Sequence, residues 1–388
     1  MIYENILSDK VKSIEPSGIR KFFDIVSEMK DAISLGVGEP DFVTPWGIRS
    51  EAIYSLERGR THYTSNAGLM ELRQEICNYL KRRVNLEYDP KKNVLITVGG
   101  SEAIDACIRA LVNPGDEVIV PEPSFVCYKP CTVLAGGTPV PIATKAENNF
   151  KLTAKELKDA ITPKTKLLIM PFPNNPTGAI MTKDELEEIA EVLRGTDICV
   201  LSDEIYSELT YGLEHTSIAS LNGMKERTIV VNGFSKTYAM TGWRLGYCVG
   251  PEEIVKQMTK IHQYAIMCAP TLSQYAAVEA LKNGDEDVNR MRDEYNYRRR
   301  FIVDGFNKIG LTCFEPQGAF YVFPCIKSTN MTSAEFCERL LMEQKVAVVP
   351  GTAFSESGEG FVRCSYAYSI ANIKEALLRI EKFVNSLK

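Results

Sequence analysis

Short, almost continuous apolar runs alternate along much of the chain with segments in which apolar residues recur every three or four positions. The runs fall at residues 93–98, 117–120, 166–170, 198–201 and 228–231. Their lack of polar alternation is typical of strands that are covered on both faces. Between them, residues 69–84 place Leu69, Leu72, Ile76 and Leu80 on one helical stripe, and residues 182–185 form a capping box that begins a helix. This alternation predicts an α/β fold with a mostly parallel sheet sandwiched by helices.

The pattern changes after residue 281. A long charged segment, 285–309, predicts a helix. Strand-like runs follow at 319–323, 346–349 and 361–365, and helix-like segments at 333–343 and 373–387. We therefore predict a large domain over 46–281 and a smaller α+β domain formed by 1–45 together with 282–388. Residues 252–281 would form the spine that joins the two.

Composition is that of a soluble globular protein. The 388 residues are 45% hydrophobic and 24% charged, enough for two domains with sizeable cores. A net charge of -5 and an isoelectric point near 5.6, without a strongly basic stretch, argue against nucleic acid as the main partner. No apolar run approaches the length of a membrane span, so we expect no membrane partner.

The cysteines and histidines indicate a cytoplasmic protein without a metal site. Eleven cysteines are scattered without paired spacing, and the first residues have neither the basic nor the apolar part of a secretory signal. We therefore expect reduced thiols and a cytoplasmic location. Cys127 and Cys131 stand four apart, but no matching Cys or His pair accompanies them, and the chain has only three histidines.

One lysine stands in an unusual setting. In Gly233-Phe-Ser-Lys-Thr-Tyr-Ala-Met-Thr-Gly-Trp-Arg-Leu-Gly246, Lys236 lies between Ser235 and Arg244. A hydroxyl and a guanidinium fork are groups that grip a phosphate dianion, and a neutral, well-held lysine amine can attack a carbonyl. A phosphate-bearing aldehyde bound here could form an imine with Lys236. A surface lysine beside a glycine-rich turn is the bland alternative.

This segment resembles the lysine motif of the class I aminotransferases, which use pyridoxal 5'-phosphate. The resemblance runs in order from about Gly18 to Tyr366 and is strongest to the bacterial and archaeal branch of aspartate and aromatic amino acid aminotransferases. It implies an aspartate aminotransferase-like fold, with a sheet of the seven-stranded type in the large domain.

Further motifs match the family at positions where an α/β sheet binds ligands. A Gly-Gly-Ser turn after the run at 93–98 resembles the phosphate-cradling turn, which implies that Gly100, Ser101 and Glu102 bind the cofactor. The resemblance assigns Asn175, before Pro-Thr-Gly, to the ring oxygen of the cofactor and to the substrate carboxylate. Asp203 ends an apolar strand, where it could keep a pyridine nitrogen protonated, with Tyr206 beside the ring oxygen. The alternatives are a plain connection for the Gly-Gly-Ser turn, an ordinary turn at Asn175 and a helix N-cap at Asp203.

The remaining matches concern the substrate and a second subunit. The resemblance makes Arg363 the binder of the substrate α-carboxylate, with an interdomain salt bridge as the alternative, and places the backbone of Gly38 near that carboxylate. Phe125 matches the aromatic residue that stacks on the pyridine ring. Tyr63 matches the tyrosine that reaches the phosphate of the neighbouring subunit, which implies a homodimer with shared active sites.

We interpret the chain as an aminotransferase that moves the α-amino group of an L-amino acid, aspartate or aromatic, to a 2-oxo acid such as 2-oxoglutarate. The expected mechanism is ping-pong with a lysine imine at Lys236, where Lys236, Asp203 and Tyr206 are the catalytic residues. A pyridoxal-phosphate-dependent β-lyase and a non-enzymatic pyridoxal-phosphate-binding regulator are the alternatives. The residues that read the substrate side chain are not identified. Ile19 and Arg20 are candidates near the mouth, and a helix-surface position explains them equally well.

Overall fold

The computed structural model describes residues 3–16, 29 and 31–387. Its centre is a seven-stranded sheet of order β2-β8-β7-β6-β5-β3-β4, in which only β8 runs against the others. The strands are β2 Val94–Thr97, β3 Glu117–Glu122, β4 Thr138–Ala143, β5 Thr165–Met170, β6 Cys199–Asp203, β7 Thr228–Gly233 and β8 Gly246–Val249. The mostly parallel sheet is confirmed, and each apolar run of the sequence contributes one of its strands.

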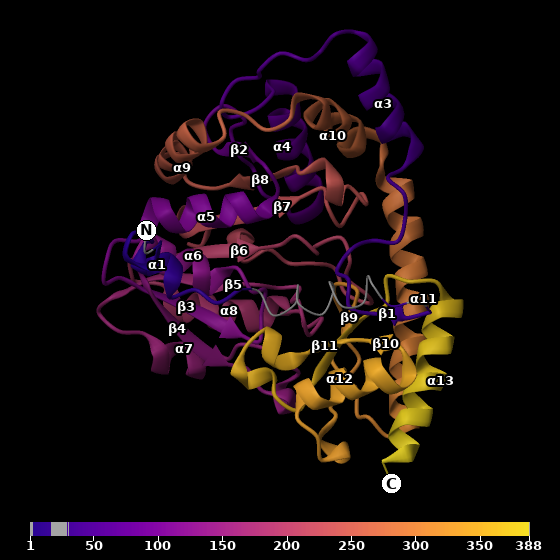
Figure 1. Cartoon of the computed structure of the whole chain (residues 1–388). Helices are drawn as coiled ribbons and strands as arrows, with labels where there is room; N and C mark the ends of the chain where they lie inside the picture. Colours follow the sequence, from indigo (N-terminus) through magenta and orange to yellow (C-terminus); the bar gives the residue numbers. More distant parts are fainter. Residues whose placement is uncertain (1–2, 17–28, 30, 388) are drawn as a thin grey trace.

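Helices cover both faces of this sheet (Figure 1). They are α3 Trp46–Glu57, α4 Met70–Val84, α5 Gly100–Leu111, α6 Tyr128–Ala135, α7 Ala154–Ala160, α8 Lys183–Leu193, α9 Glu252–Ala265 and α10 Thr271–Asn283. In β5, Leu167 and Ile169 join the core that contains α5 and α9, whereas Leu168 and Met170 join the core that contains α8. Because successive side chains enter opposite cores, the strand has no polar face, which explains its continuous apolar run.

The helix signals of the sequence are reproduced. The stripe of α4 buries Leu72, Ile76 and Leu80, and Leu69 stands just before the helix. The predicted capping box is present: the Thr182 side chain accepts from the backbone N–H of Glu185, and the Glu185 side chain accepts from that of Thr182.

The C-terminal residues build a second layer around their own core. Its elements are α11 Asp285–Ile309, β9 Tyr321–Val322, α12 Ser333–Gln344, β10 Val346–Ala347, β11 Val349–Pro350, β12 Val362–Ser365 and α13 Ile370–Ser386. β12 is the middle of a three-stranded antiparallel sheet, and β1 Ile33–Ser34 pairs in parallel with β10. The segment around residue 33 therefore lies against the C-terminal elements, as Figure 1 shows.

The helix that spans both layers is α11 rather than the segment 252–281. That segment is broken into α9 and α10, with Met267 in the left-handed region at φ 75° between them and Pro270 at the N-cap of α10. In α11, Val288 lies in the core shared with α10, and Met291 and Tyr295 lie in the C-terminal core. Figure 1 shows α11 running along one side of the molecule past both layers.

Short elements complete the chain. They are η1 Tyr3–Asn5, α1 Asp9–Lys12, η2 Ala146–Asn148, η3 Ile218–Ser220, η4 Lys225–Arg227, η5 Thr241–Trp243, η6 Lys327–Thr329, η7 Gly351–Ala353 and η8 Glu356–Gly358. Within the described residues, no helix has the length and apolar character needed to cross a membrane.

Candidate active site

A cavity of about 330 Å³ lies where β5, β6 and β7 end and α5 begins, closed on the other side by β9 and β12. Every residue that the resemblance assigned to the cofactor or the substrate lines it except Glu102 and Tyr63. These lining residues are Gly38, Gly100, Ser101, Phe125, Asn175, Asp203, Tyr206, Ser235, Lys236, Arg244 and Arg363. The carboxyl ends of parallel strands meet at one edge of a sheet, which brings together residues that are far apart in sequence.

The Lys236 amine is held inside this cavity. Its Nζ donates to the carbonyl oxygen of Gly38 at 2.5 Å and lies 6.0 Å from the ring centroid of Tyr206. The pKa of Lys236 is lowered to about 8, mainly by burial. Glu39 opposes this shift, and the nearby guanidinium groups of Arg363 and Arg244 contribute to it. Near neutral pH, an appreciable fraction of this amine is therefore in the nucleophilic neutral form.

Asp203 is a buried carboxylate at the end of β6. Its Oδ2 accepts from the Tyr128 hydroxyl at 2.7 Å, and its Oδ1 accepts from the backbone N–H of Ile205 at 3.2 Å. Burial raises the pKa of Asp203 to about 6, although both hydrogen bonds act to lower it. Asp203 caps no helix, because the residues after it form a turn. Tyr128 was not singled out from the sequence, where its only signal is a place three residues after Phe125.

Arg363 is positioned by stacking and by hydrogen bonds to uncharged groups. Its guanidinium lies 4.5 Å from the ring centroid of Tyr321 and 4.9 Å from that of Phe354. Nη1 donates to Asn175 Oδ1 at 2.9 Å, and Nη2 donates to the Gly36 carbonyl. Its Nε is buried without a hydrogen-bond partner, and its hydrogen bonds to the described residues go to an amide and a carbonyl rather than to a carboxylate. An interdomain salt bridge therefore does not account for Arg363 in this structure.

Two tyrosines face each other beside Arg363. The hydroxyl groups of Tyr206 and Tyr321 are 2.8 Å apart, and both side chains are buried. Tyr321 is a second lining residue that sequence reasoning missed, because it reads as one apolar position of a strand. It also explains Gly38: a Cβ at that position would lie 2.5 Å from the Tyr321 hydroxyl.

The opposite end of the cavity carries the start of α5 and the residues of the lysine motif. Gly99, the N-cap of α5, has φ +80°, and a Cβ there would lie 2.8 Å from an Arg244 guanidinium nitrogen. The first N–H groups of a helix have no partner within the helix and attract anions. Ser101, Ser235 and Arg244 add hydroxyl and cationic donors at this end.

Two predicted residues lie outside the cavity. The Glu102 carboxylate turns away from it, to the backbone N–H of Val98 and to Nδ1 of His262, so only the backbone of Glu102 stays at the start of α5. Tyr63 is 80% exposed and therefore points away from this chain's own core, and its role toward a neighbouring subunit stays a prediction. Ile19 and Arg20 are outside the described residues.

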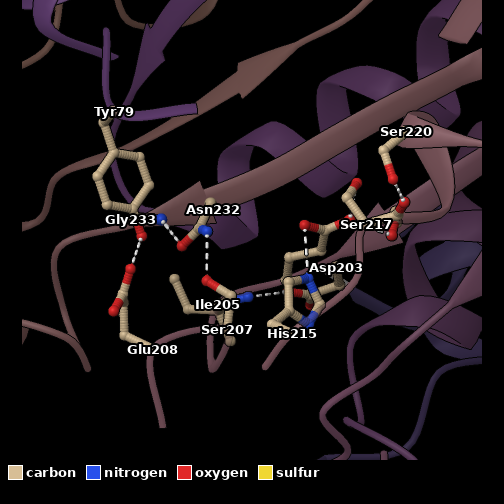
Figure 2. Close-up of polar contacts among 12 residues, drawn as sticks. Tyr79, Asp203, Ile205, Ser207, Glu208, His215, Ser217, Ser220, Asn232 and Gly233 are labelled. Carbon is tan, nitrogen blue, oxygen red and sulfur yellow. Dashed lines mark hydrogen bonds and ion pairs between the residues drawn. The ribbon is translucent and has the colours of Figure 1, made fainter. Parts of the chain in front are cut away.

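A second group of polar side chains, outside the cavity, holds the turn after β6 by hydrogen bonds (Figure 2). Glu204 Oε1 accepts from the hydroxyls of Ser202 and Ser217 at 2.8 and 2.6 Å, and Oε2 lies 2.8 Å from His215 Nε2. Farther along, Glu208 Oε1 accepts from the Tyr79 hydroxyl at 2.5 Å. Tyr79, Glu204, Glu208 and His215 line a separate cavity of about 510 Å³. Asp203 and Tyr206 line the first cavity, so the end of β6 and the turn after it present side chains to both cavities.

The charges of the first cavity fit pyridoxal phosphate. Among the described residues, Asp203 has two neutral donors and no cationic partner, and a protonated pyridine nitrogen would supply the missing charge. The opposite end offers unpaired N–H groups, hydroxyls and Arg244 for a phosphate dianion. Lys236 lies in the same cavity with the lowered pKa that attack on a carbonyl requires.

Comparison with known proteins agrees with this geometry. The family described as aminotransferase class I and II matches residues 30–380. A putative aminotransferase of Bacillus subtilis, YugH, is 56% identical, with 98% of each chain covered. The aspartate aminotransferase of Pyrococcus abyssi is 49% identical over 98% of this chain and 99% of its own. A solved aromatic aminotransferase of Pyrococcus horikoshii superposes with a TM-score of 0.90 at 45% identity, covering 95% of this chain and 99% of that one.

The match extends over most of the chain, and the relatives are similar over their whole length. The chain therefore belongs to the class I and II aminotransferases and is a pyridoxal-phosphate-dependent aminotransferase with the aspartate aminotransferase fold.

Proposed function

We propose that the enzyme transfers the α-amino group of L-aspartate or of an aromatic L-amino acid to a 2-oxo acid, with 2-oxoglutarate as the acceptor, in a ping-pong mechanism. One observation carries the proposal: a lysine of lowered pKa and an unpaired buried carboxylate share one cavity with an arginine that has no carboxylate partner among the described residues. The relatives whose names specify aspartate or aromatic amino acids support the choice of donor.

Lys236 and Asp203 divide the chemistry in this proposal. Pyridoxal phosphate, when bound, supplies an electrophilic carbonyl and a ring that accepts electron density. The Lys236 amine holds the cofactor covalently at rest and, once free, moves the proton at the substrate Cα as base and then as acid. The Asp203 carboxylate keeps a proton on the ring nitrogen, which strengthens the ring as an electron acceptor. Tyr206, with Asn175, donates to the ring oxygen.

The two ends of the cavity bind the two anionic groups. Arg363, with Asn175 and the backbone at Gly38, takes the substrate α-carboxylate in place of its present neutral partners. The backbone N–H groups at Gly100 and Glu102 take the cofactor phosphate. Ser101, Ser235 and Arg244 complete that end, and Phe125 stacks on the ring.

We also propose how the sites are assembled. Tyr63 of one subunit completes the phosphate end of its partner in a cytoplasmic homodimer. Within each subunit, residues 46–281 form the cofactor domain, and residues 1–45 with 282–388 form the small domain. The division places the cavity between the two, because Arg363 and Tyr321 come from the C-terminal elements and Asp203 from the sheet.

An absorption experiment tests the proposed reaction. The purified protein with pyridoxal phosphate should show a yellow band that bleaches with the true donor amino acid and returns with 2-oxoglutarate. The donor that bleaches it fastest defines the substrate class. Release of pyruvate and ammonia from a cysteine conjugate, without amino-group exchange, would instead identify a β-lyase.

Variants connect this reaction to Lys236. Lys236→Ala should lose the bleaching half-reaction, because no other amine of the described residues lines the cavity. Lys256→Ala, which removes an exposed lysine of α9, is the matched control and should bleach as the wild type does. Half-reaction turnover that survives in Lys236→Ala would refute the role of Lys236.

A further inference from the structure

The first turn of α5 is tied to α9 through a buried histidine. Glu102 Oε1 lies 2.5 Å from His262 Nδ1, and Glu102 Oε2 accepts from the backbone N–H of Val98 at 2.5 Å. The His262 side chain is fully buried, and that of Glu102 is 15% exposed. One carboxylate thus closes the turn from Val98 to Gly100 and is itself held by His262.

The surroundings of the other ring nitrogen, Nε2, indicate which tautomer His262 adopts. Nε2 is buried and has no hydrogen-bond partner among the described residues. A buried N–H without an acceptor is costly, so we assign the proton to Nδ1, which makes His262 the donor and Glu102 the acceptor.

The same histidine lies in the last turn of α9, beside the loop that carries Tyr63. Its carbonyl oxygen accepts from the backbone N–H of Ile266 at 2.8 Å and of Met267 at 3.0 Å. The Met267 carbonyl in turn accepts from Asn66 Nδ2 at 2.8 Å. His262 therefore stands between the start of α5 and the 62–66 loop.

We infer that His262 is a positioning residue for cofactor phosphate. By holding the Glu102 carboxylate, it keeps a negative charge away from the phosphate end and holds the first turn of α5, with the backbone N–H groups at Gly100 and Glu102, in position for the phosphate. Without the histidine donor, Glu102 would be a carboxylate without that partner in the first turn of α5, near a phosphate dianion, where the two negative charges repel. The inference rests on the proposed phosphate site.

Two ligands that differ only in the phosphate measure this role. We would determine the dissociation constants of pyridoxal phosphate and of unphosphorylated pyridoxal for each variant, and take their ratio as the phosphate preference. His262→Leu should lower this preference about tenfold, because a hydrogen bond to a charged group is lost. His262→Asn, whose amide can place a donor near the position of Nδ1, should restore it. Glu102→Gln in the His262→Leu background should also recover part of it, because the uncompensated charge is gone.

A second histidine that is paired with a glutamate provides the matched control. His215 Nε2 lies 2.8 Å from Glu204 in the same kind of pair, but it lines the other cavity. His215→Leu should leave the phosphate preference unchanged even if it weakens both ligands. Equal weakening of both ligands by His262→Leu, or failure of His262→Asn to restore the preference, would overturn the inference.

Arg244→Gln separates this inference from the site on which it rests. If Arg244→Gln lowers the phosphate preference and His262→Leu does not, the phosphate site stands and the role of His262 is refuted. If Arg244→Gln has no effect on the preference, the proposed phosphate site itself is wrong.

Discussion

At the scale of single residues, burial acts on Lys236 and Asp203 in opposite directions for one reason. Removing either group from water disfavours its charged form, which lowers the pKa of the lysine to about 8 and raises that of the aspartate to about 6. In the protein without cofactor, neither charge has an opposite charge bonded to it among the described residues. The two buried groups thus destabilise the folded protein as long as no cofactor is bound.

Asp203→Asn should separate stability from activity. The carboxyl group of Asp203 binds its proton more tightly in the folded chain than in the unfolded chain, where its pKa is 3.8. The free energy of unfolding of the cofactor-free protein should therefore fall as the pH rises from about 4 to about 6, and the cost of about 3 kcal/mol persists above that range. The asparagine avoids this cost but loses one hydrogen bond, so we expect a net gain of about 2 kcal/mol at pH 8.

Denaturant unfolding of the cofactor-free protein at pH 4 and pH 8 measures this gain, which should nearly vanish at pH 4. The same variant should bind pyridoxal phosphate and transaminate at a rate lower by a factor on the order of a hundred. A variant that is no more stable at pH 8, or that keeps the wild-type rate, would contradict the account of Asp203.

At the scale of elements, the lysine motif is the connection between two paired strands. Gly233 ends β7, Gly246 begins β8, and the two are register partners in the antiparallel pair. The connection between them carries Lys236 and Arg244 into the cavity. A Cβ on Gly246 would lie 2.6 Å from the backbone carbon of Gly99 and 2.7 Å from the backbone nitrogen of Gly100. The start of α5 therefore rests directly on the end of the motif.

Gly246→Ala should move the start of α5. The contact is with backbone rather than with a flexible side chain, so we expect a loss of about 1–3 kcal/mol in the free energy of unfolding. The variant should also lose more affinity for pyridoxal phosphate than for pyridoxal, since Gly100 lies at the phosphate end. Denaturant unfolding and ligand titration measure the two effects.

Gly242→Ala is the control within the same motif. A Cβ there would meet no atom within 4 Å, and its backbone lies outside the left-handed region. It should leave both quantities close to the wild type. If the two variants behave alike, contact between Gly246 and the start of α5 does not constrain the site.

At the scale of the whole molecule, exposed apolar side chains support assembly with a second copy. Tyr63, Trp46 and Tyr264 are 80%, 64% and 88% exposed, and Ile53 and Met267 are about half exposed. Contiguous groups of large exposed apolar side chains are typical of interaction surfaces. The loop with Tyr63 is pinned to the segment after α9 by the bond from Asn66 to Met267.

Mixed dimers test whether the sites are shared. Neither Lys236→Ala nor Tyr63→Ala homodimers should be fully active. A hybrid dimer of one chain of each kind should regain one intact site, because its functional Lys236 meets the partner's Tyr63. Separately tagged chains, purified as the hybrid, allow the rate per dimer to be compared with the wild type. If Tyr63 serves its own subunit, the hybrid stays at the level of the Tyr63→Ala chain.

The sequence by itself determined the fold class and most residues of the proposed site. Apolar runs without polar alternation predicted the parallel sheet, since a strand covered on both faces has no side for polar residues. Motifs at strand ends, together with the resemblance to the class I aminotransferases, predicted Lys236, Asp203, Asn175, Arg244 and Arg363 as one site. The order of strands in the sheet could not be predicted, because contacts between segments distant in the sequence decide which strands pair.

Only the tertiary structure decided what surrounds those residues. Tyr128 and Tyr321 look like ordinary apolar positions in the sequence, and only folding shows their hydroxyls at Asp203 and Tyr206. Glu102 was predicted at the phosphate, but its side chain turns to His262, a residue 160 positions away. Local sequence patterns reflect only the interactions of a segment with residues near it in the chain. Burial, pKa and the choice of hydrogen-bond partner depend on elements that only packing brings together.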